Sequence, residues 1–392
     1  MQVEKVSETL YKFTLSLSDQ SDAFTVNMAA CVGQDGILLV DAGWTQTAQE
    51  VDERVRELGD AHVKLIVITH PHLDHHGGCA VFGRQATLIA HKNARDELSG
   101  KYFALDKLPG QELPTIDVQD TLSLRFNGQE IRIISAPGHT HSDMVVYFVD
   151  AGVVCLGDLV LADRFPPLDL GRGGNAEQYA ASLEKLTTLF PPDVKFVTGH
   201  GRDYTLDDLK THHRMTADTI GLIKKGIADG KNAQEMIDTE LLKDWEKWDN
   251  PQVPAATWIT QVYENLVGET KKSIVEPLTY TIVEKGIDAA IEQYTELKTK
   301  QPDAYNFGEN DLNMLGYQLM WRNMHEAAVK VHELNIQVYP QSANPYDSLG
   351  ETYMASGNEE LGIESYKKAL SINPDLPSAI DALEKLGSRN NS

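Results

Sequence analysis

One short stretch of the sequence concentrates side chains that bind metal ions. It reads THPHLDHHGG (69–78) and directly follows the apolar run VKLIVI (63–68). Because that run has the character of a buried strand, its four candidate ligands leave the end of one strand together. We expect His70 and His72 to share one position, and Asp74 and His75 to point to a second position beside it. Imidazole and carboxylate ligands suit zinc, with iron or manganese as alternatives, so two adjacent ions are expected.

Three further candidate ligands follow apolar runs later in the chain. They are His139 in PGHT (137–140), Asp158 in GDL (157–159) and His200 in TGHG (198–201). Each directly follows a glycine, which indicates a tight backbone turn where a side chain approaches an ion closely. A folded sheet could bring all of these strand ends to one edge.

The elements that must position these residues alternate in character from residue 11 to about residue 197. Short apolar, β-branched runs predict strands at 11–17, 24–32, 36–43, 63–70, 131–136, 144–149 and 153–158. Apolar residues at helical spacing predict helices at 47–58 and 176–190. This alternation is typical of a layered α/β domain.

The sequence becomes helical in character after His200. Pro302, Pro340 and Pro374 are expected to end similar helices, and the last two lie 34 residues apart. That step and the apolar pattern around it are typical of tetratricopeptide repeats. We therefore predict a catalytic domain at 1–205, a helical extension at 206–270 and a tetratricopeptide-like helical domain at 271–392.

Composition narrows the classes of function. The chain has 392 residues, with 35 Lys+Arg against 58 Asp+Glu and a formal net charge of −23, so nucleic acid is a poor partner. No apolar run reaches the length of a membrane-spanning helix, and the three cysteines are expected to be small core residues. The first residues do not resemble a secretory leader. A cytoplasmic location is favoured, and a periplasmic or secreted one stays open if a leader has been removed.

The order His-x-His-x-Asp-His, followed by a later His, Asp and His, resembles the metallo-beta-lactamase fold superfamily of hydrolases over about the first 200 residues. The resemblance implies an αββα sandwich with a dinuclear metal site, two zinc ions being expected, at one edge. It also implies the ligand sets. One ion would be held by His70, His72 and His139, the second by Asp74, His75 and His200, and Asp158 would bridge both.

Such a site implies hydrolysis by a metal-activated water molecule. Asp74 would be the catalytic residue that orients this water or passes a proton to the leaving group. Asp41 either resembles the outer acid that orients a ligand in this family or forms a turn before Gly43. The expected substrate is a small ester, lactone, thioester or amide such as a beta-lactam. Hydroxyacylglutathione hydrolases and lactonases share all seven ligand positions, so the ligands do not choose between them.

Two loop stretches are candidates for substrate contact. Their apolar residues would form a pocket wall or simply pack, and these are Tyr102, Phe103, Phe165, Pro166 and Leu168. Arg164 and Arg172 could accept an anionic group of the substrate. Among the other histidines, His76 and His141 are expected behind the ligands or in the pocket lining. Structural roles are expected for His91, His212 and His213.

A different class of function also fits the sequence. The tetratricopeptide-like helices could bind a protein partner or build a homodimer, with the metal domain acting as a scaffold or sensor. In that case the chain would be an adaptor rather than primarily a hydrolase.

Overall fold

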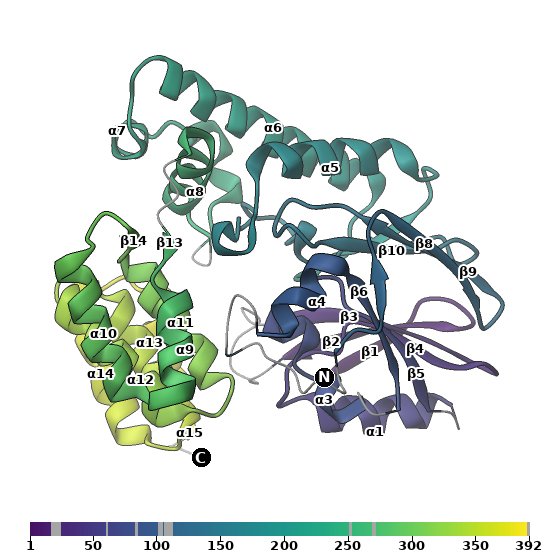
Figure 1. The fold of residues 1–392 in the computed structure, drawn as a ribbon, viewed down its shortest axis with the longest axis horizontal. Coiled ribbons are helices and arrows are strands. Elements are labelled where there is room, and N and C mark those ends of the chain that lie inside the picture. The colour runs from purple at the N-terminus through teal and green to yellow at the C-terminus, as the bar shows by residue number, and fades with distance from the viewer. Residues whose placement is uncertain are drawn as a thin grey trace. The chain divides into compact units, whose positions relative to one another are not determined.

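The computed structural model describes residues 1–16, 25–59, 62–82, 85–100, 105, 113–250, 253–268 and 272–389 (Figure 1). They divide into two compact units. The first comprises Met1–Lys101 and Asp106–Thr270, and the second comprises Tyr102–Leu105 and Lys271–Ser392. Within the described residues, no helix has both the length and the apolar character needed to span a membrane.

Seven strands form the first sheet of the first unit, and they pair in chain order. They are β1 (Gln2–Lys5), β2 (Leu10–Ser16), β3 (Thr25–Gly33), β4 (Gly36–Val40), β5 (Val63–Val67), β6 (Thr87–His91) and β7 (Ile116–Val118). Pairing is antiparallel from β1 to β4 and parallel from β4 to β7. The parallel strands are joined through α1 (Ala48–Leu58), α2 (Leu73–His76), α3 (Cys79–Phe82) and α4 (Lys92–Leu98).

Five strands form the second sheet, in the spatial order β12-β11-β10-β9-β8. They are β8 (Thr121–Phe126), β9 (Gln129–Ser135), β10 (Met144–Phe148), β11 (Val153–Cys155) and β12 (Lys195–Val197). Only β11 and β12 pair in parallel, through a crossover that includes α5 (Ala176–Leu189). The 3₁₀ turns η4 (Gly157–Leu159) and η5 (Leu170–Arg172) lie in the same crossover.

Side-chain alternation along the strands builds three apolar layers. In β4, Leu38 and Val40 enter the core shared by the two sheets, whereas Ile37 and Leu39 enter the core beneath α1, α3 and α4. Strand β10 alternates in the same way between the shared core and the core beneath α5. Helices therefore cover the outer face of each sheet, as Figure 1 shows for α1 and α5. The first unit is the predicted αββα sandwich.

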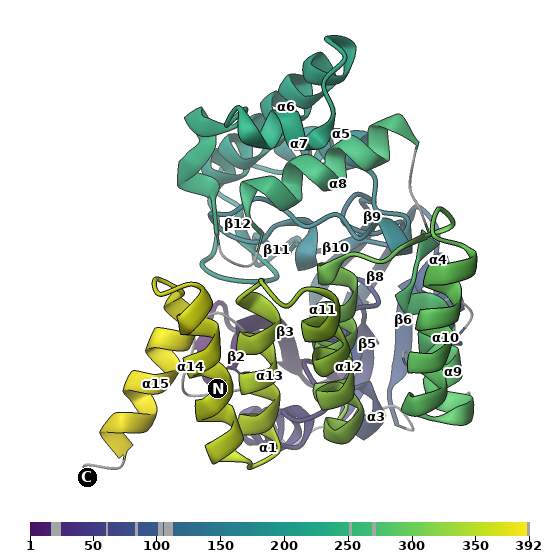
Figure 2. The same ribbon diagram turned by 90° about the vertical axis from the view of Figure 1, so that its left-hand side faces the viewer.

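The helices that follow the second sheet share its outer core. They are α6 (Leu206–Ala228), α7 (Ala233–Asp238) and α8 (Ala255–Val267), with the 3₁₀ turn η6 (Lys243–Trp248) between α7 and α8. Trp258 of α8 is fully buried and donates its indole N–H to Thr219 of α6. A capping box between Thr205 and Asp208 begins α6. These helices extend the layer that covers the second sheet (Figure 2).

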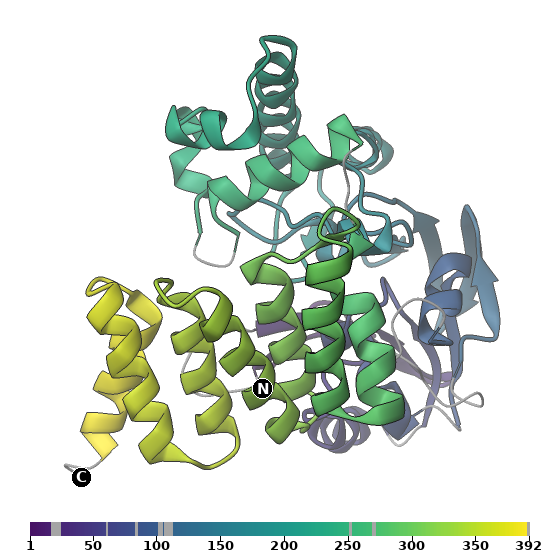
Figure 3. The same cartoon turned by 60° about the vertical axis from the view of Figure 1, so that its left-hand side comes forward.

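The second unit is a row of packed helices, drawn from green to yellow in Figure 3. They are α9 (Val275–Lys285), α10 (Ile287–Lys300), α11 (Glu309–Met320), α12 (His325–Val338), α13 (Asn344–Ala355), α14 (Glu359–Ile372) and α15 (Pro377–Arg389). The two-residue strands β13 (Lys272–Ser273) and β14 (Tyr305–Asn306) pair beside them. Pro302, Pro340 and Pro374 each stand two residues beyond a helix end, as predicted. Whether the row is a tetratricopeptide-like array stays a prediction.

Candidate metal centre

The candidate ligands follow strand ends on both sheets. The loop after β5 carries His70 to His75, and the loops after β9, β11 and β12 carry His139, Asp158 and His200. Backbone hydrogen bonds join the sheets at this edge. Met144 N donates to Thr69 O at 2.9 Å, and Asn27 N donates to Gly199 O at 2.8 Å. The fold thus brings segments distant in sequence to one seam between the two sheets.

All seven predicted ligands meet at this seam in two overlapping groups. One group contains His70, His72, His139 and Asp158, and the other contains Asp74, His75, His200 and Asp158. Within each group the potential ligand atoms lie within 4.8 Å of one another. Asp158 alone belongs to both groups.

The two carboxylate oxygens of Asp158 divide between the groups. Its Oδ1 lies 3.1 Å from Nε2 of both His75 and His200. Its Oδ2 lies 3.6 Å from Nε2 of His70 and 3.9 Å from Nε2 of His139. Asp74 Oδ2 lies 3.2 Å from His200 Nε2 on the far side of the second group. The arrangement suits a carboxylate that bridges two ions.

Outer hydrogen bonds fix the tautomers of the five clustered histidines. His139 Nδ1 donates to Pro167 O at 2.8 Å, and His200 Nδ1 donates to Thr25 O. A carbonyl oxygen can only accept, so both Nδ1 atoms carry the proton. In the neutral ring the inward Nε2 then presents a bare lone pair.

Asp41 fixes the tautomers of two more histidines, His75 directly and His70 through Thr69, so that Nδ1 carries the proton in both. Its Oδ2 accepts from His75 Nδ1 at 2.8 Å and from Thr69 Oγ1 at 2.8 Å. Because the Thr69 hydroxyl proton is already donated to Asp41, this oxygen accepts from His70 Nδ1, which lies 3.2 Å away. Asp41 therefore orients ligands rather than only forming a turn, although its φ of 64° is also left-handed.

In the first group, the ring nitrogens of the three histidines that face one another carry no hydrogen atoms. His72 Nε2 donates to Asp169 Oδ2 at 2.8 Å, so its Nδ1 is bare. That Nδ1 lies 3.0 Å from Nε2 of both His70 and His139. Three neutral lone pairs at this spacing repel unless a cation stands among them. The donor set therefore fits a metal ion, and imidazole with carboxylate fits zinc, iron or manganese.

The electrostatic potential at the second group of candidate ligands is strongly negative. Burial opposes the charged form of His75, but Asp158, Asp74 and Asp41 outweigh it and raise its pKa well above the ordinary value. The same balance between burial and Asp158 raises the pKa of His200 to about 10. Burial alone would raise the pKa of Asp158, but His200, His75 and His70 lower it well below its usual range. A field that stabilises protons here also favours a metal cation.

Close packing explains two of the glycines that precede ligands. A Cβ on Gly199 would lie 2.1 Å from Asp158 Oδ1, so only glycine allows this strand end to approach the Asp158 carboxylate. Gly157 has a φ of 53°, and its Cβ would lie 2.6 Å from Thr69 Oγ1. The predicted tight turns are present at both positions.

Several loop residues have roles different from those expected. Arg172 is 4% exposed and ion-paired with Glu97 and Asp169, so the interpretation of Arg172 as an acceptor for a substrate anion is wrong. Phe165, Pro166 and Leu168 are buried, which supports packing rather than a pocket wall. Arg164 is partly buried, and its Nε donates to Ala162 O at 3.3 Å. Tyr102 and Phe103 lie outside the described residues.

Among the remaining histidines, His91 caps α4 by accepting from Asn93 N, and His212 is fully buried, as expected for structural residues. His76 is buried, whereas the side chain of His141 is 29% exposed. Sequence reasoning missed Asp169, which binds His72 from 97 residues away. It also missed Asp143, which accepts from the backbone N–H groups of Gly138 and Thr140 and so braces the His139 loop. No local spacing marks either aspartate.

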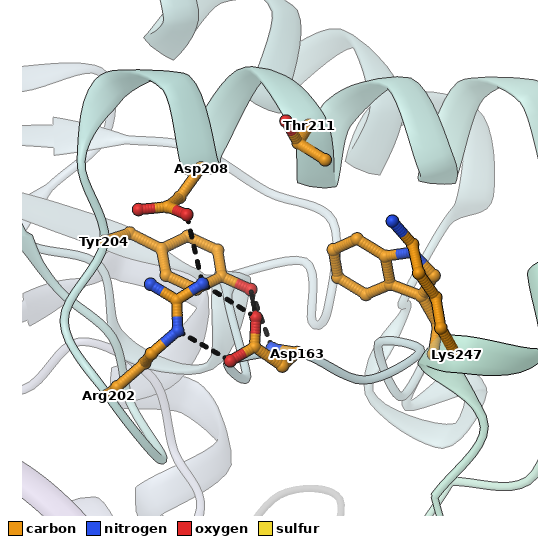
Figure 4. Close-up of a pocket in the computed structure, with 7 residues that line it drawn as sticks. Asp163, Arg202, Tyr204, Asp208, Thr211 and Lys247 are labelled. Atoms are coloured by element: carbon orange, nitrogen blue, oxygen red, sulfur yellow. Dashed lines mark hydrogen bonds and ion pairs between the residues drawn. The ribbon is translucent and has the colours of Figure 1, made fainter.

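A separate cavity of about 250 Å³ lies beside the loop that follows His200 (Figure 4). Arg202 crosses it, with its guanidinium 4.7 Å from the centre of the Tyr204 ring. Asp163 binds this guanidinium with two hydrogen bonds and Asp208 with a third, so its charge is satisfied within the protein. Trp248 also lines the cavity. None of the seven candidate ligands lines this cavity.

The part of the chain that carries the candidate ligands is similar to a known family. The family model described as "Metallo-beta-lactamase superfamily" matches residues 21–200. A hydroxyacylglutathione hydrolase from Synechococcus sp. (strain JA-3-3Ab) is 27% identical over 218 residues, which cover 54% of this chain and 80% of that protein. A hydroxyacylglutathione hydrolase from Aeromonas hydrophila subsp. hydrophila is 32% identical over 197 residues, which cover 48% of this chain and 67% of that protein.

One similar solved structure is a metallo-beta-lactamase from Pontibacter korlensis. It is 18% identical with a TM-score of 0.47, and the match covers 54% of this chain and 98% of that chain.

Proposed function

Because the chain belongs to the metallo-beta-lactamase superfamily, we propose that it is a two-metal hydrolase that cleaves a small thioester to a carboxylic acid and a thiol. The single observation that carries the proposal is the pair of donor groups sharing Asp158. The choice of a thioester, over an ester, lactone or amide, is supported by the relatives named hydroxyacylglutathione hydrolase.

The ligand assignment follows the two groups. His70, His72 and His139 would hold one zinc ion, Asp74, His75 and His200 would hold the other, and Asp158 would bridge them. Zinc at such a site supplies Lewis acidity, which makes water a better nucleophile at neutral pH and polarises a carbonyl group. Iron or manganese would supply related chemistry with the same donors.

The side chains of this protein supply orientation and proton transfer. Asp41, Pro167 O and Thr25 O hold the ligand imidazoles in the tautomer that leaves the inward nitrogen bare. Asp74 is the residue placed to carry a proton, because its carboxylate stands at the edge of the second group with its side chain 18% exposed. In our proposal it orients the attacking water, accepts the proton which that water loses, and then delivers this proton to the leaving thiolate.

A substrate panel tests this function. Full-length protein loaded with zinc, manganese or iron is assayed on thioesters, esters, lactones and beta-lactams, after its metal content has been measured. We expect about two ions per chain, hydrolysis that is greatest on a thioester, and loss of both on chelation. Protein that holds two ions but hydrolyses none of these classes would contradict the proposal.

We further propose that the chain is organised as 1–205, 206–270 and 271–392, with the last part a tetratricopeptide-like domain that binds a protein partner or a second copy. Support comes from the close helix contacts at small residues. A Cβ on Gly350 would lie 2.7 Å from the Tyr366 ring, and one on Gly362 would lie 2.7 Å from Met354 Sδ. Removing residues 271–392 tests the proposal, since a separate binding domain predicts that hydrolysis survives while oligomerisation or partner capture is lost.

A further inference from the structure

A chain of hydrogen-bonded polar side chains leads away from the first metal group and ends in a buried ion pair. Asp169 Oδ2, which accepts from His72 Nε2 at 2.8 Å, also accepts from Arg172 Nε at 3.1 Å. Arg172 Nη1 in turn donates to Glu97 Oε2 at 2.8 Å. The chain therefore runs from His72 through Asp169 and Arg172 to Glu97, from the seam of the sandwich to α4.

Glu97 stands where neither the helix dipole nor burial favours a carboxylate. It lies in the last turn of α4, where the helix dipole opposes negative charge, and its side chain is 0% exposed. A carboxylate buried without a cation is strongly destabilising, so Glu97 requires the guanidinium of Arg172. The ion pair is consequently a fixed anchor inside the protein and not an exposed pair that solvent can replace.

Arg172 holds Asp169 through the backbone as well as through the side chain. Its N–H donates to Asp169 Oδ1 at 3.1 Å, while its Nε donates to Oδ2, so both carboxylate oxygens are held by one residue. The same loop is fastened to the His139 loop, because Asp169 N donates to His139 O at 2.9 Å and His141 N donates to Arg172 O at 3.0 Å. Two of the three histidines of the first group are thus tied to this short segment.

We propose that Arg172, anchored by Glu97, is a positioning residue that fixes Asp169 against His72 and so aims the His72 imidazole at the first metal position. The inference rests on the proposed two-metal function, because it assigns these residues to the orientation of one of its ligands. It predicts that the two metal positions respond unequally when the anchor is altered.

The test measures metal affinity rather than turnover. Full-length wild type, Glu97→Gln and Arg172→Lys are titrated with Zn²⁺ against a chromophoric chelator, and the absorption spectrum of the Co²⁺-loaded proteins is recorded. Glu97→Gln keeps the shape of the side chain but removes its charge, and Arg172→Lys keeps the charge but removes the planar fork. We expect affinity at the first metal position, and therefore one of the two Zn²⁺ affinities, to fall about 10- to 100-fold in Arg172→Lys, with a changed Co²⁺ spectrum, and less in Glu97→Gln.

Lys12→Gln is the matched control. Lys12 Nζ lies 2.6 Å from Asp203 Oδ1 in another ion pair with little exposure, but no ligand histidine hydrogen-bonds to that pair. This variant should lower the midpoint of thermal unfolding without changing the Co²⁺ spectrum. Asp169→Asn combined with Arg172→Lys should lower affinity no further than Asp169→Asn alone, since both act through one hydrogen bond.

The inference is overturned if folded Glu97→Gln and Arg172→Lys bind both ions as tightly as wild type, or if Lys12→Gln loses as much affinity as they do. Wild type that binds two ions and hydrolyses a thioester keeps the proposed function standing in either case. Wild type that binds no transition metal overturns the proposed function and this inference together.

Discussion

Buried histidines occur in both units, and they differ in what surrounds them. At the seam of the sandwich, each clustered imidazole has its outer nitrogen fixed by an acceptor and its inner nitrogen aimed at its neighbours. In the helical unit, His332 of α12 is also 0% exposed, but neither ring nitrogen has a hydrogen-bond partner among the described residues. Burial lowers the pKa of His332 to about 3, so its ring is neutral. Burial alone therefore does not identify a metal ligand. The clustered histidines differ from His332 because an acceptor holds the outer nitrogen of each ring while the inner nitrogens point toward one another.

Asp158, the proposed bridging residue, gives the largest expected contrast. Asp158→Asn keeps the size of the side chain but replaces one carboxylate oxygen with an amide NH₂ group and removes the negative charge. We expect turnover to fall by roughly a thousandfold or more, with a smaller change in KM, because the charge that holds the two ions together is lost. Steady-state kinetics and metal analysis check this. Unchanged turnover in protein that still holds two ions would remove the bridging role.

Two glycine-to-alanine substitutions compare a crowded position at the candidate metal centre with an open position on a helix. Gly199→Ala places a methyl group 2.1 Å from Asp158 Oδ1, so the carboxylate must shift and metal affinity should fall by about 10- to 100-fold. Gly221→Ala, in the middle of α6 with nothing within 4 Å of its Cβ, should instead stabilise the protein by about 1 kcal/mol. Chelator competition and denaturant unfolding measure the two effects. Equal behaviour of the two variants would mean that the close approach at Gly199 is unimportant.

The helical unit should respond to pH through two acids of α13. Burial raises the pKa of Asp347 to about 6. Burial, together with the negative charge of Asp347, raises the pKa of Glu351 to about 7. Since the folded pKa values exceed the ordinary ones, the stability contributed by the protonated forms is complete below about pH 4 and is lost as pH rises through 6 and 7. Metal retention at the seam should change in the opposite direction, because ligands must be deprotonated.

Hydrogen exchange at pH 5 and pH 8 measures this difference helix by helix. Amides of α11 and α13 should be better protected at pH 5 in wild type. The double variant Asp347→Asn, Glu351→Gln should lose that dependence, since neither replacement titrates while Gln can still accept from the Tyr317 hydroxyl. A wild-type protein whose helical unit is more protected at pH 8 would contradict the assignment.

The smallest expected effect is that of replacing His332, and it tests directly whether this buried histidine differs from those at the seam. His332→Leu removes two unpartnered ring nitrogens and keeps an apolar side chain of similar volume against Gly316. We expect a gain of about 1 kcal/mol in the free energy of unfolding, because a buried polar group without partners costs stability, and no change in hydrolysis. A loss of activity would show that His332 is more than a packing residue.

The seven candidate ligands could be selected from the sequence because they follow apolar strands and keep a dense local order. The structure brings them together, and their binding of metal stays a prediction. Predicted strands at 36–43, 63–70 and 144–149 contain β4, β5 and β10. Strands β6 and β8, which have five and six residues, were missed from the sequence, as were the three-residue strands β7 and β12, although the equally short β11 was predicted. Strand length alone therefore does not explain which strands were found. Arg172 was misread because sequence does not show that a loop arginine is buried, and its partner Glu97 lies 75 residues earlier.

The seam has a consequence for residues remote from it. The first group takes His70 and His72 from the loop of one sheet and His139 from a loop of the other, so the thickness of the apolar layer between the sheets sets how far apart the donors stand. Side chains such as Leu38 and Phe148 define that thickness. Enlarging or shrinking one of them would change the gap that an ion must fill, so hydrolysis should depend on the volume of interior side chains that touch neither substrate nor metal.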